Sequence, residues 1–383
     1  MFVFPGQGSQ WAGMGAELLD TSPVFADSIA RCQTALDPYI DWSLTDALRG
    51  HLDLTRVDIV QPTLFATMVA LADLWQSLGI HPTAVIGHSQ GEIAAATIAG
   101  ALTLHDGARI AALRSQAILA IAGHGGMASI PLSHEDTTQL LAPWRHQLAI
   151  AAHNGPTTTV IAGDATALTE LLTHCEHHQI RARRIDVDYA SHTHHVETIH
   201  QQLLDQLAGI TPKPATIPLY STVTGTPIDT TTLTPDYWYT NLRQPVRFTD
   251  AIRTALTDGH TTYVEISPHP VLTTTIQDTA ETTNHPTLTT ATLRRDEGNW
   301  TRLLTSLAHL HTHGHPVDWT PHLHPGHHPD LPTYPFQRER FWLTPPATAN
   351  PRSAGLDSAG HPLLAAAVPL PDDEGVLLTG RLS

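Results

Sequence analysis

The sequence predicts an α/β fold with two parts, a large subdomain built on a mainly parallel sheet and a smaller unit inserted into it. Two observations support this prediction. Short apolar runs alternate with helical patterns through residues 1–125, which is typical of a parallel sheet covered by helices. In residues 126–187 the expected order becomes strand, helix, strand, strand, helix, strand, the β-α-β-β-α-β order of a ferredoxin-like unit.

Apolar spacing indicates the elements of the first part. Residues 2–4 form a short apolar run that predicts a buried strand, and the glycine-rich turn after it ends the strand. Residues 83–86 predict a second strand. Apolar residues recur at helical spacing in the segments 25–36, 63–78, 93–101 and 106–122.

The inserted unit begins where Gly123, Gly125 and Gly126 interrupt the helical pattern. Its strands are expected at 127–131, 148–153, 158–163 and 181–187, and its helices at 135–144 and 165–177. The earlier kind of pattern then resumes, with helices at 196–207, 249–256 and 271–279 and strands at 217–221 and 262–266. The unit therefore interrupts one large subdomain.

The composition changes after residue 290. Residues 300–313 predict one more helix, and proline and histidine dominate residues 315–348, which indicates an extended linker. Apolar alternation returns within 361–383 and predicts the opening strands of a further, truncated domain. We expect a first domain at 1–290 (large subdomain 1–125 and 188–290, small subdomain 126–187), a linker at 291–348 and the start of another domain at 349–383.

Composition excludes several classes of protein. The net charge of −16 disfavours nucleic acid as a partner. We find no apolar run long enough for a membrane span, and the start of the chain lacks the basic segment of a signal peptide. The two cysteines, Cys32 and Cys175, lie far apart, which favours a reducing, cytoplasmic location. The 27 histidines show no spacing of a structural zinc site, so we expect no metal.

The segment Gly87-His88-Ser89-Gln90-Gly91 is the most informative motif. It is a Gly-x-Ser-x-Gly sequence between an apolar strand and an alanine-rich helix, the context of a nucleophile elbow. Ser89 would stand at the tip of a sharp turn, beside the N-terminus of a helix that favours negative charge. This arrangement suits acyl transfer through a serine ester. A small-residue turn is the alternative interpretation.

A second loop, Pro5-Gly6-Gln7-Gly8-Ser9-Gln10, follows the first strand. Ligands bind at the carboxyl ends of parallel strands, so this loop and Ser89 are expected to share one crevice. The backbone N–H groups of Gln7 and Gln90 would then stabilise an oxyanion. A tight turn or a phosphate loop is the alternative, although no Gly-Lys-Ser/Thr follows to make a Walker loop.

Two further side chains complete the candidate site. Arg114 lies among alanines and leucines on a predicted helix, and its planar guanidinium suits a carboxylate partner; a structural salt bridge is the alternative. His192, His194 and His195 follow the inserted unit, and an imidazole can act as the base for Ser89. The spacing does not choose among the three, and a backbone carbonyl is one candidate for orienting the base.

Taken together, the motifs resemble the acyltransferase domains of modular type I polyketide synthases, which are related to malonyl-CoA:acyl carrier protein transacylases. The resemblance extends over residues 2–342 and rests on the segments 6–10, 87–92, 113–116, 189–192, 239–243 and 265–270 in this order. Residues 331–337 resemble the end of the linker that follows such domains, and residues from His361 onward resemble the start of a dehydratase domain.

The resemblance implies a hydrolase-like large subdomain and a role for each candidate residue. Ser89 would be the nucleophile and His192 the general base, oriented by the carbonyl of Asn241. Arg114 would bind the carboxylate of the acyl group, and Gln7 and Gln90 would form the oxyanion hole. The substrate pocket would be lined by Gln61, His88, Tyr189 and Ser191.

The resemblance also implies a substrate and partners. No bound cofactor is expected; a coenzyme A thioester is the substrate, and the phosphopantetheine thiol of an acyl carrier protein receives the acyl group. Neighbouring ketosynthase and dehydratase domains are expected partners. The methylmalonyl-selecting subgroup is resembled at residues 56–61, at Gln90 and at the Tyr189–His192 segment. The physical sense of this resemblance is that Ser191, which is smaller than phenylalanine, leaves room for an α-methyl group. The alternatives are a malonyl-specific acyltransferase, a serine hydrolase or esterase, and an inactive scaffold module.

Overall fold

The computed structural model describes residues 1–320, 332–339, 341–342, 350–371 and 374–380. The chain forms two compact units, Met1–His324 and Pro325–Ser383. The first unit holds the predicted large and small subdomains.

The large subdomain is built on a six-stranded sheet in the order β10-β9-β1-β2-β7-β8. Its strands are β1 (Phe2–Phe4), β2 (Val85–Gly87), β7 (Leu219–Ser221), β8 (Thr226–Pro227), β9 (Thr262–Glu265) and β10 (Leu288–Ala291). All neighbours pair parallel except β7 and β8, which form an antiparallel edge. Because β1 and β2 are parallel and in register, the loops at their carboxyl ends emerge side by side.

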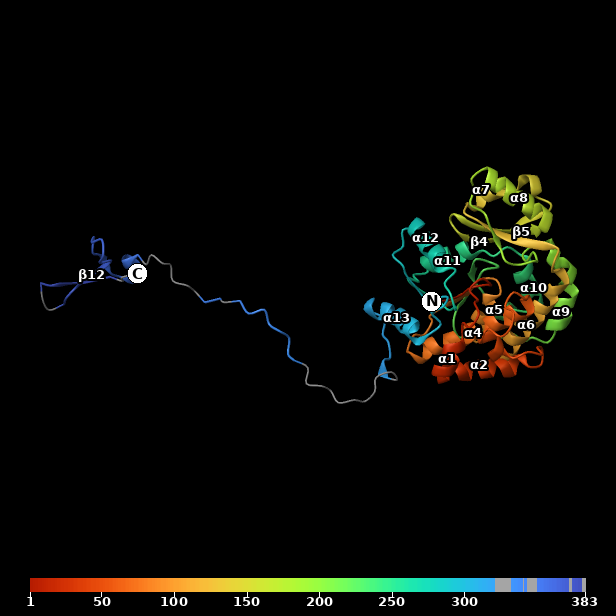
Figure 1. Ribbon diagram of the computed structural model, residues 1–383, viewed down its shortest axis with the longest axis horizontal. Helices are drawn as coiled ribbons and strands as arrows, with labels where there is room; N and C mark the ends of the chain where they lie inside the picture. Colours follow the sequence, from red (N-terminus) through yellow and green to blue (C-terminus); the bar gives the residue numbers. More distant parts are fainter. Residues whose placement is uncertain (321–331, 340, 343–349, 372–373, 381–383) are drawn as a thin grey trace. The chain divides into compact units, whose positions relative to one another are not determined.

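Alternate residues of the central strands face opposite layers of helices. Phe2 and Phe4 join the core under one layer, and Val3 joins the core under the other. The helices are α1 (Ala16–Thr21), α2 (Pro23–Leu36), α3 (Leu44–Leu48), α4 (Val57–Ser77), α5 (Gly91–Ile98), α6 (Leu104–Ile118), α9 (His200–Leu207), α10 (Pro235–Arg243), α11 (Phe248–Thr257), α12 (Thr273–Thr282) and α13 (Trp300–Thr312). Figure 1 shows α11 and α12 above the N-terminus and α1, α2 and α4 below it.

Helix α4 is long and apolar enough, by length and composition, to cross a membrane. Nearly all of its residues are buried inside the first unit, so it serves as the central helix of the core. It begins at Val57, before the expected start at residue 63, and it continues through Pro62, which lies inside the helix and leaves one backbone hydrogen bond unmade.

The small subdomain has the predicted β-α-β-β-α-β order. Its elements are β3 (Gly125–Ile130), α7 (His134–Leu140), β4 (Leu148–Gly155), β5 (Thr158–Asp164), α8 (Ala165–His177) and β6 (Arg183–Ile185). The strand order is β4-β5-β3-β6, with every neighbouring pair antiparallel, which confirms the ferredoxin-like arrangement. Helices α7 and α8 cover the outer face of this sheet, and the other face turns toward the large subdomain (Figure 1).

Several element boundaries differ from the expectations. The helix expected at 135–144 stops at Leu140 and gives way to a short 3₁₀ turn, η2 (Ala142–Trp144), because Pro143 has no amide hydrogen to continue the helix. The helix expected at 196–207 begins with the 3₁₀ turn η3 (His194–Ile199) before α9. This unit also contains the 3₁₀ turns η1 (Leu119–Ile121) and η4 (Thr230–Thr232).

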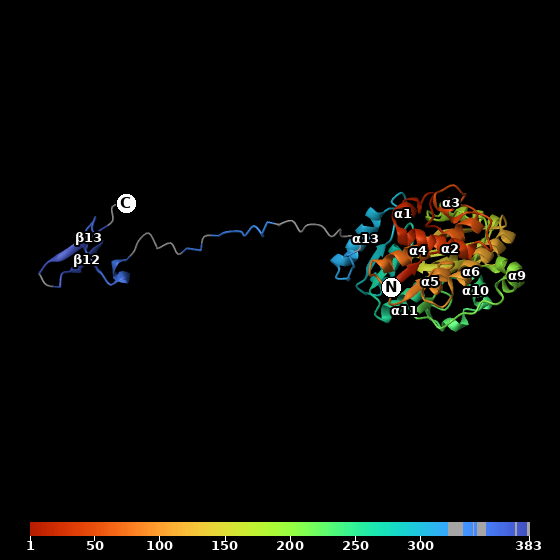
Figure 2. The ribbon, with the colours of Figure 1, turned by 90° about the horizontal axis from the view of Figure 1, so that it is seen from below.

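The expected end of the first domain at residue 290 is too early. Strand β10 ends at Ala291, and α13 buries Leu303, Leu307 and Leu310 in the same core as Phe2. Both views show α13 beside α1 (Figure 1 and Figure 2). Residues 291–320 therefore belong to the first unit. Much of the predicted linker, including 321–331 and 343–349, lies outside the described residues.

The second unit contains a small antiparallel sheet in the order β11-β12-β13. Its elements are η6 (Pro351–Ala354), β11 (Asp357–Ser358), β12 (Ala366–Pro369) and β13 (Val376–Thr379). Strands β12 and β13 lie where apolar alternation predicted strands, whereas β11 precedes that range. That they open a dehydratase-like domain stays a prediction.

Close packing at the end of β1 makes Gly91 irreplaceable. A Cβ atom added at Gly91 would lie 2.1 Å from the backbone oxygen of Phe4. We predict that Gly91→Ala lowers the free energy of unfolding by about 3 kcal/mol. Gly259→Ala is the control, because Gly259 has a φ of +91° but nothing within 4 Å of its added Cβ. This variant should lower the free energy of unfolding by only about 1 kcal/mol. Equal losses in chemical denaturation would contradict this account.

Candidate active site

Ser89 stands at the turn between β2 and α5, where the sequence predicted an elbow. Its backbone has a φ of 53°, and His192 has a φ of 63°. Non-glycine residues in this region are strained, and such strain gathers at functional sites. The Ser89 hydroxyl lies 2.9 Å from Nε2 of His192. Two strained residues, 103 positions apart in the chain, are thus held within hydrogen-bond distance.

The tautomer of His192 follows from its second ring nitrogen. Nδ1 lies 2.7 Å from the backbone oxygen of Gln244, and a carbonyl oxygen can only accept. Nδ1 therefore carries the hydrogen, and Nε2 is left to accept the hydroxyl proton of Ser89. Burial, and then the positive charge of Arg114, lower the pKa of His192 to about 3. The imidazole is consequently a neutral, available base.

The prediction that Asn241 orients His192 is wrong. Asn241 lies inside α10, and its side-chain amide donates to Oε2 of Glu92 at 2.8 Å and to the backbone oxygen of Ser89 at 3.3 Å. Gln244 follows the last turn of α10 in an extended conformation, which frees its carbonyl for His192. The orienting group is a backbone carbonyl, as the residues alone had left open.

Glu92 anchors the elbow from behind. Its carboxyl group is fully buried and accepts hydrogen bonds from the Tyr237 hydroxyl, from Thr222 at 3.1 Å and from Asn241. Burial raises the pKa of Glu92 to about 7. These bonds join α5 to the end of β7 and to α10, so the residues around Ser89 are held by three separate elements.

The other two candidate histidines do not reach Ser89. His194 is exposed, and His195 bonds through Nε2 to Oδ1 of Asp164 at 2.7 Å. Of the three histidines that the spacing left open, only His192 contacts the Ser89 hydroxyl.

Two free backbone donors line the site. Among the described residues, neither the Gln7 nor the Gln90 backbone N–H donates a hydrogen bond. Both residues line the same cavity as Ser89. The side-chain oxygen of Gln7 accepts a hydrogen bond from Tyr189 at 2.7 Å, which holds the Gln7 loop in place. Free N–H groups facing a cavity can stabilise a negative oxygen.

The cavity has a volume of about 160 Å³ and lies between the two subdomains. The predicted pocket residues Gln61, His88, Tyr189 and Ser191 all line it, as does Arg114. The small subdomain contributes lining residues that the sequence analysis missed, namely Met127, Ala152, Asn154, Val160 and Ile185. Apolar strand residues carry no chemical signal of a site, and the polar Asn154 belongs to no motif, so only the fold could reveal these five.

His88 is fixed by one of these residues. Its Nε2 lies 2.7 Å from the side-chain oxygen of Asn154, so Nε2 carries the hydrogen. Its Nδ1 is buried and has no partner among the described residues. Burial lowers the pKa of His88, which leaves a neutral ring beside Ser89.

Arg114 presents an unpaired buried charge to the cavity. Its side chain is 1% exposed, and neither Nε nor Nη1 has a hydrogen-bond partner among the described residues. The salt bridge considered from the sequence is absent from the ion pairs of the described residues. Burial lowers the pKa of Arg114 to about 10, so it stays charged at neutral pH. A buried, unpaired guanidinium is suited to an anionic ligand.

The roles of Asn241 and Gln244 can be separated by experiment. We predict that Asn241→Ala lowers the free energy of unfolding by about 1–3 kcal/mol, because Glu92 loses a buried donor. Since Gln244 still holds His192, labelling of Ser89 by a fluorophosphonate should slow less than about 10-fold. If Asn241 instead set the tautomer, the rate would fall by about 10⁴ at nearly unchanged stability. Labelling kinetics and denaturant titration together decide between the two.

Comparisons with known proteins agree with this geometry. Residues 1–317 match the family described as acyl transferase domain. The chain is 52% identical over 387 residues to the polyketide synthase GfsE of Streptomyces halstedii, covering 100% of this chain and 10% of that synthase. The chain thus spans about a tenth of the length of the curated relatives it matches.

Two solved structures share the fold. The acyltransferase domain from module 8 of the salinomycin polyketide synthase is 54% identical, with a TM-score of 0.81, over 83% of this chain and 76% of that one. The acyltransferase domain of SpnD, in complex with 2-(pent-4-yn-1-yl)malonyl, is 28% identical, with a TM-score of 0.75, over 82% of this chain and 76% of that one. The chain therefore belongs to the acyl transferase domain family, among the acyltransferase domains of modular polyketide synthases.

Proposed function

We propose that this acyltransferase domain transfers a methylmalonyl unit from coenzyme A to the phosphopantetheine thiol of an acyl carrier protein, through an ester on Ser89. One observation carries the proposal: a buried, unpaired Arg114 guanidinium shares a small cavity with the Ser89–His192 pair. A neutral ester would leave that charge without a counter-ion, whereas a carboxylated acyl group supplies one.

The first half-reaction uses the Ser89–His192 pair. Nε2 of His192 takes the proton of Ser89 as its oxygen attacks the thioester carbonyl and forms the new C–O bond. The N–H groups of Gln7 and Gln90 stabilise the resulting oxyanion, and one such donor typically contributes about 10²–10³ to the rate. When the C–S bond breaks, His192 returns its proton to the coenzyme A sulfur.

Arg114 links substrate binding to the base. The substrate carboxylate binds the guanidinium bidentately, and its negative charge offsets the positive charge that helps to lower the pKa of His192. His192 then holds the transferred proton more easily during the reaction. An acyl group without a carboxylate leaves Arg114 uncompensated, so it both binds and reacts less well.

The α-substituent is assigned from the cavity around Ser191. Ser191 is buried, is smaller than phenylalanine, and lines the cavity beside Gln61 and Tyr189. The SpnD domain binds a malonyl group with a large α-substituent, so this fold accommodates substitution at that carbon. Discrimination of one methyl group is worth only about 1–3 kcal/mol, which suffices for a preference between methylmalonyl and malonyl.

The second half-reaction reverses the first with a different thiol. The phosphopantetheine thiol of the carrier gives its proton to His192 and attacks the acyl ester, and Ser89 leaves as the alcohol. A larger groove, of about 740 Å³, reaches Gln244 between the subdomains and is lined by His153, Arg247 and Arg253. Arg253 contributes a positive charge to this groove, whereas Arg247 pairs with Asp250 at 2.8 Å. Glu135 adds a negative charge, and burial lowers the pKa of His153 to about 4, so its ring is neutral. The carrier, and the neighbouring ketosynthase and dehydratase domains, would belong to the larger synthase.

The carboxylate anchor is tested with Arg114→Ala. The variant should lower kcat/KM for methylmalonyl-CoA by about 100-fold, the range expected when a charge-assisted hydrogen-bond pair is lost. Its kcat/KM for propionyl-CoA, which has no carboxylate, should change little or rise. Arg109→Ala is the matched control on the same helix, since Arg109 bonds to the backbone oxygen of Gln206; it should keep the wild-type preference. Equal losses with both thioesters in Arg114→Ala would overturn the proposal.

The methyl preference is tested with Ser191→Phe. The larger ring should fill the space for the α-methyl group and lower the ratio of kcat/KM for methylmalonyl-CoA over malonyl-CoA by at least about 10-fold. Ser191→Ala is the control and should leave the ratio within about 3-fold. Competition between the two thioesters, read by mass spectrometry of the acyl-enzyme, gives the ratio. A wild-type preference for malonyl-CoA would reverse the assignment while keeping the transfer reaction.

A further inference from the structure

A second cluster of polar side chains lies away from the cavity, where the subdomains meet. Asp164 ends β5 of the small subdomain, and His194 and His195 begin η3 of the large subdomain. One ligand atom from each side chain lies within 4.8 Å of the other two. Asp164 lies 30 positions before His194 and 31 positions before His195 in the chain, so the spacing of metal motifs could not reveal this cluster.

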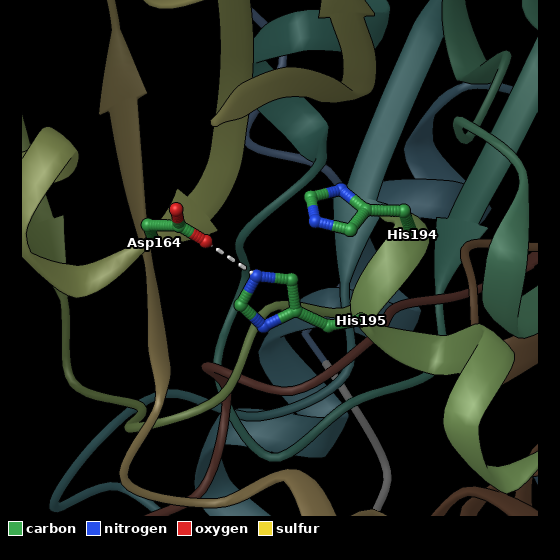
Figure 3. Close-up of side chains that lie close together, drawn as sticks. All are labelled: Asp164, His194 and His195. Carbon is green, nitrogen blue, oxygen red and sulfur yellow. Dashed lines mark hydrogen bonds and ion pairs between the residues drawn. The ribbon is translucent and has the colours of Figure 1, made fainter. Parts of the chain in front are cut away.

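The three side chains surround a common space. Nε2 of His195 lies 2.7 Å from Oδ1 of Asp164, and the two imidazole rings have centroids 4.8 Å apart at an angle of 71°. Figure 3 shows the carboxylate and both rings gathered around one point. His195 is half-buried, whereas His194 is exposed, so an ion could reach the cluster from solvent.

The backbone holds these residues while leaving ligand atoms free. The Asp164 N–H donates to the Gln147 backbone oxygen at 3.0 Å, and the His195 N–H donates to the Thr193 hydroxyl at 3.2 Å. Among the described residues, neither ring nitrogen of His194 makes a hydrogen bond, and no hydrogen bond or ion pair involves the second carboxylate oxygen of Asp164. The cluster therefore contains nitrogen and oxygen atoms that are available to bind a metal ion.

We infer that Asp164, His194 and His195 bind a divalent ion of the zinc class, with solvent at the remaining position. Imidazole together with carboxylate is a ligand set for Zn²⁺, Ni²⁺ or Cu²⁺, and three protein ligands with an open fourth position is a known tetrahedral zinc arrangement. Ligand atoms about 2.1 Å from a tetrahedral ion lie about 3.4 Å apart. The hydrogen-bonded pair must separate slightly and the His194 ring must turn inward.

Such an ion would join the two subdomains near the point where the chain passes between them. Asp164 pairs with Gly125 at the start of β3, the first strand of the small subdomain. The acyl cavity is lined by both subdomains. An ion bound at this junction would therefore hold the two subdomains in one orientation relative to each other. The inference does not rest on the proposed function, because it concerns ion binding and stability.

A metal titration must exclude two other histidine pairs. His174 and His178 stack on the surface at α8 with centroids 4.0 Å apart, and His309 and His313 lie 4.7 Å apart at the end of α13. Pairs four residues apart on a helix face the same side and could hold an ion themselves. Variants at these pairs are the matched controls.

The experiment uses calorimetric titration of the whole chain with Zn²⁺, together with the Tm measured in Zn²⁺ and in EDTA. The wild type should bind Zn²⁺ and show a Tm that rises with its concentration. Asp164→Asn and His195→Asn should each weaken this binding at least 10-fold and abolish the rise in Tm, with a Tm in EDTA close to the wild type. His178→Asn and His313→Asn should retain both effects.

Two outcomes would overturn the inference. Wild-type affinity in Asp164→Asn and His195→Asn would show that zinc binds elsewhere, and loss of binding in His178→Asn or His313→Asn would identify where. A failure of acyl transfer would leave the metal result unaffected, since neither readout depends on activity. Mg²⁺ serves as a further control and should not bind, because it prefers ligand sets made of oxygen alone.

Discussion

A positive charge buried without a protein counter-ion is the constraint on which the site depends. Arg114 is held inside the core by α6, where an unpaired ion costs several kcal/mol. The same charge helps to hold His192 in its neutral form. An acyl group that carries a carboxylate would relieve both effects, so binding energy and the strength of the base change together in our proposal.

The scaffold places the reacting groups with little freedom. The parallel pairing of β1 and β2 sets the Gln7 loop beside the Ser89 elbow, and the close approach of α5 to β1 requires glycine at Gly91. Behind the elbow, Glu92 joins three elements through buried hydrogen bonds. Fixed donors and a fixed nucleophile need no rearrangement during the reaction, which is the basis of electrostatic preorganisation.

Motifs and apolar patterns in the sequence predicted those parts of the architecture that depend on residues close together in the chain. The Gly-x-Ser-x-Gly segment with its apolar flanks predicted the turn at Ser89, and alternating patterns predicted the inserted unit. The orienting carbonyl of Gln244 could not be found in this way, because every residue has a backbone carbonyl. Strand β10 was missed because its threonine-rich sequence gives a weak apolar signal. The first domain was ended too early because a change in composition does not reveal that Leu303, Leu307 and Leu310 of α13 pack in the same core as Phe2. The pairing of Asp164 with His195 depends on the relative placement of two subdomains, which no local pattern encodes.

The most direct test of the central claim is intact-protein mass spectrometry after brief exposure to equal concentrations of methylmalonyl-CoA, malonyl-CoA and propionyl-CoA. We predict a methylmalonyl adduct on the wild type, little or no propionyl adduct, and no adduct on Ser89→Ala. A propionyl adduct as abundant as the carboxylated ones would contradict the role of the buried Arg114 charge. An adduct retained by Ser89→Ala would contradict the serine ester itself.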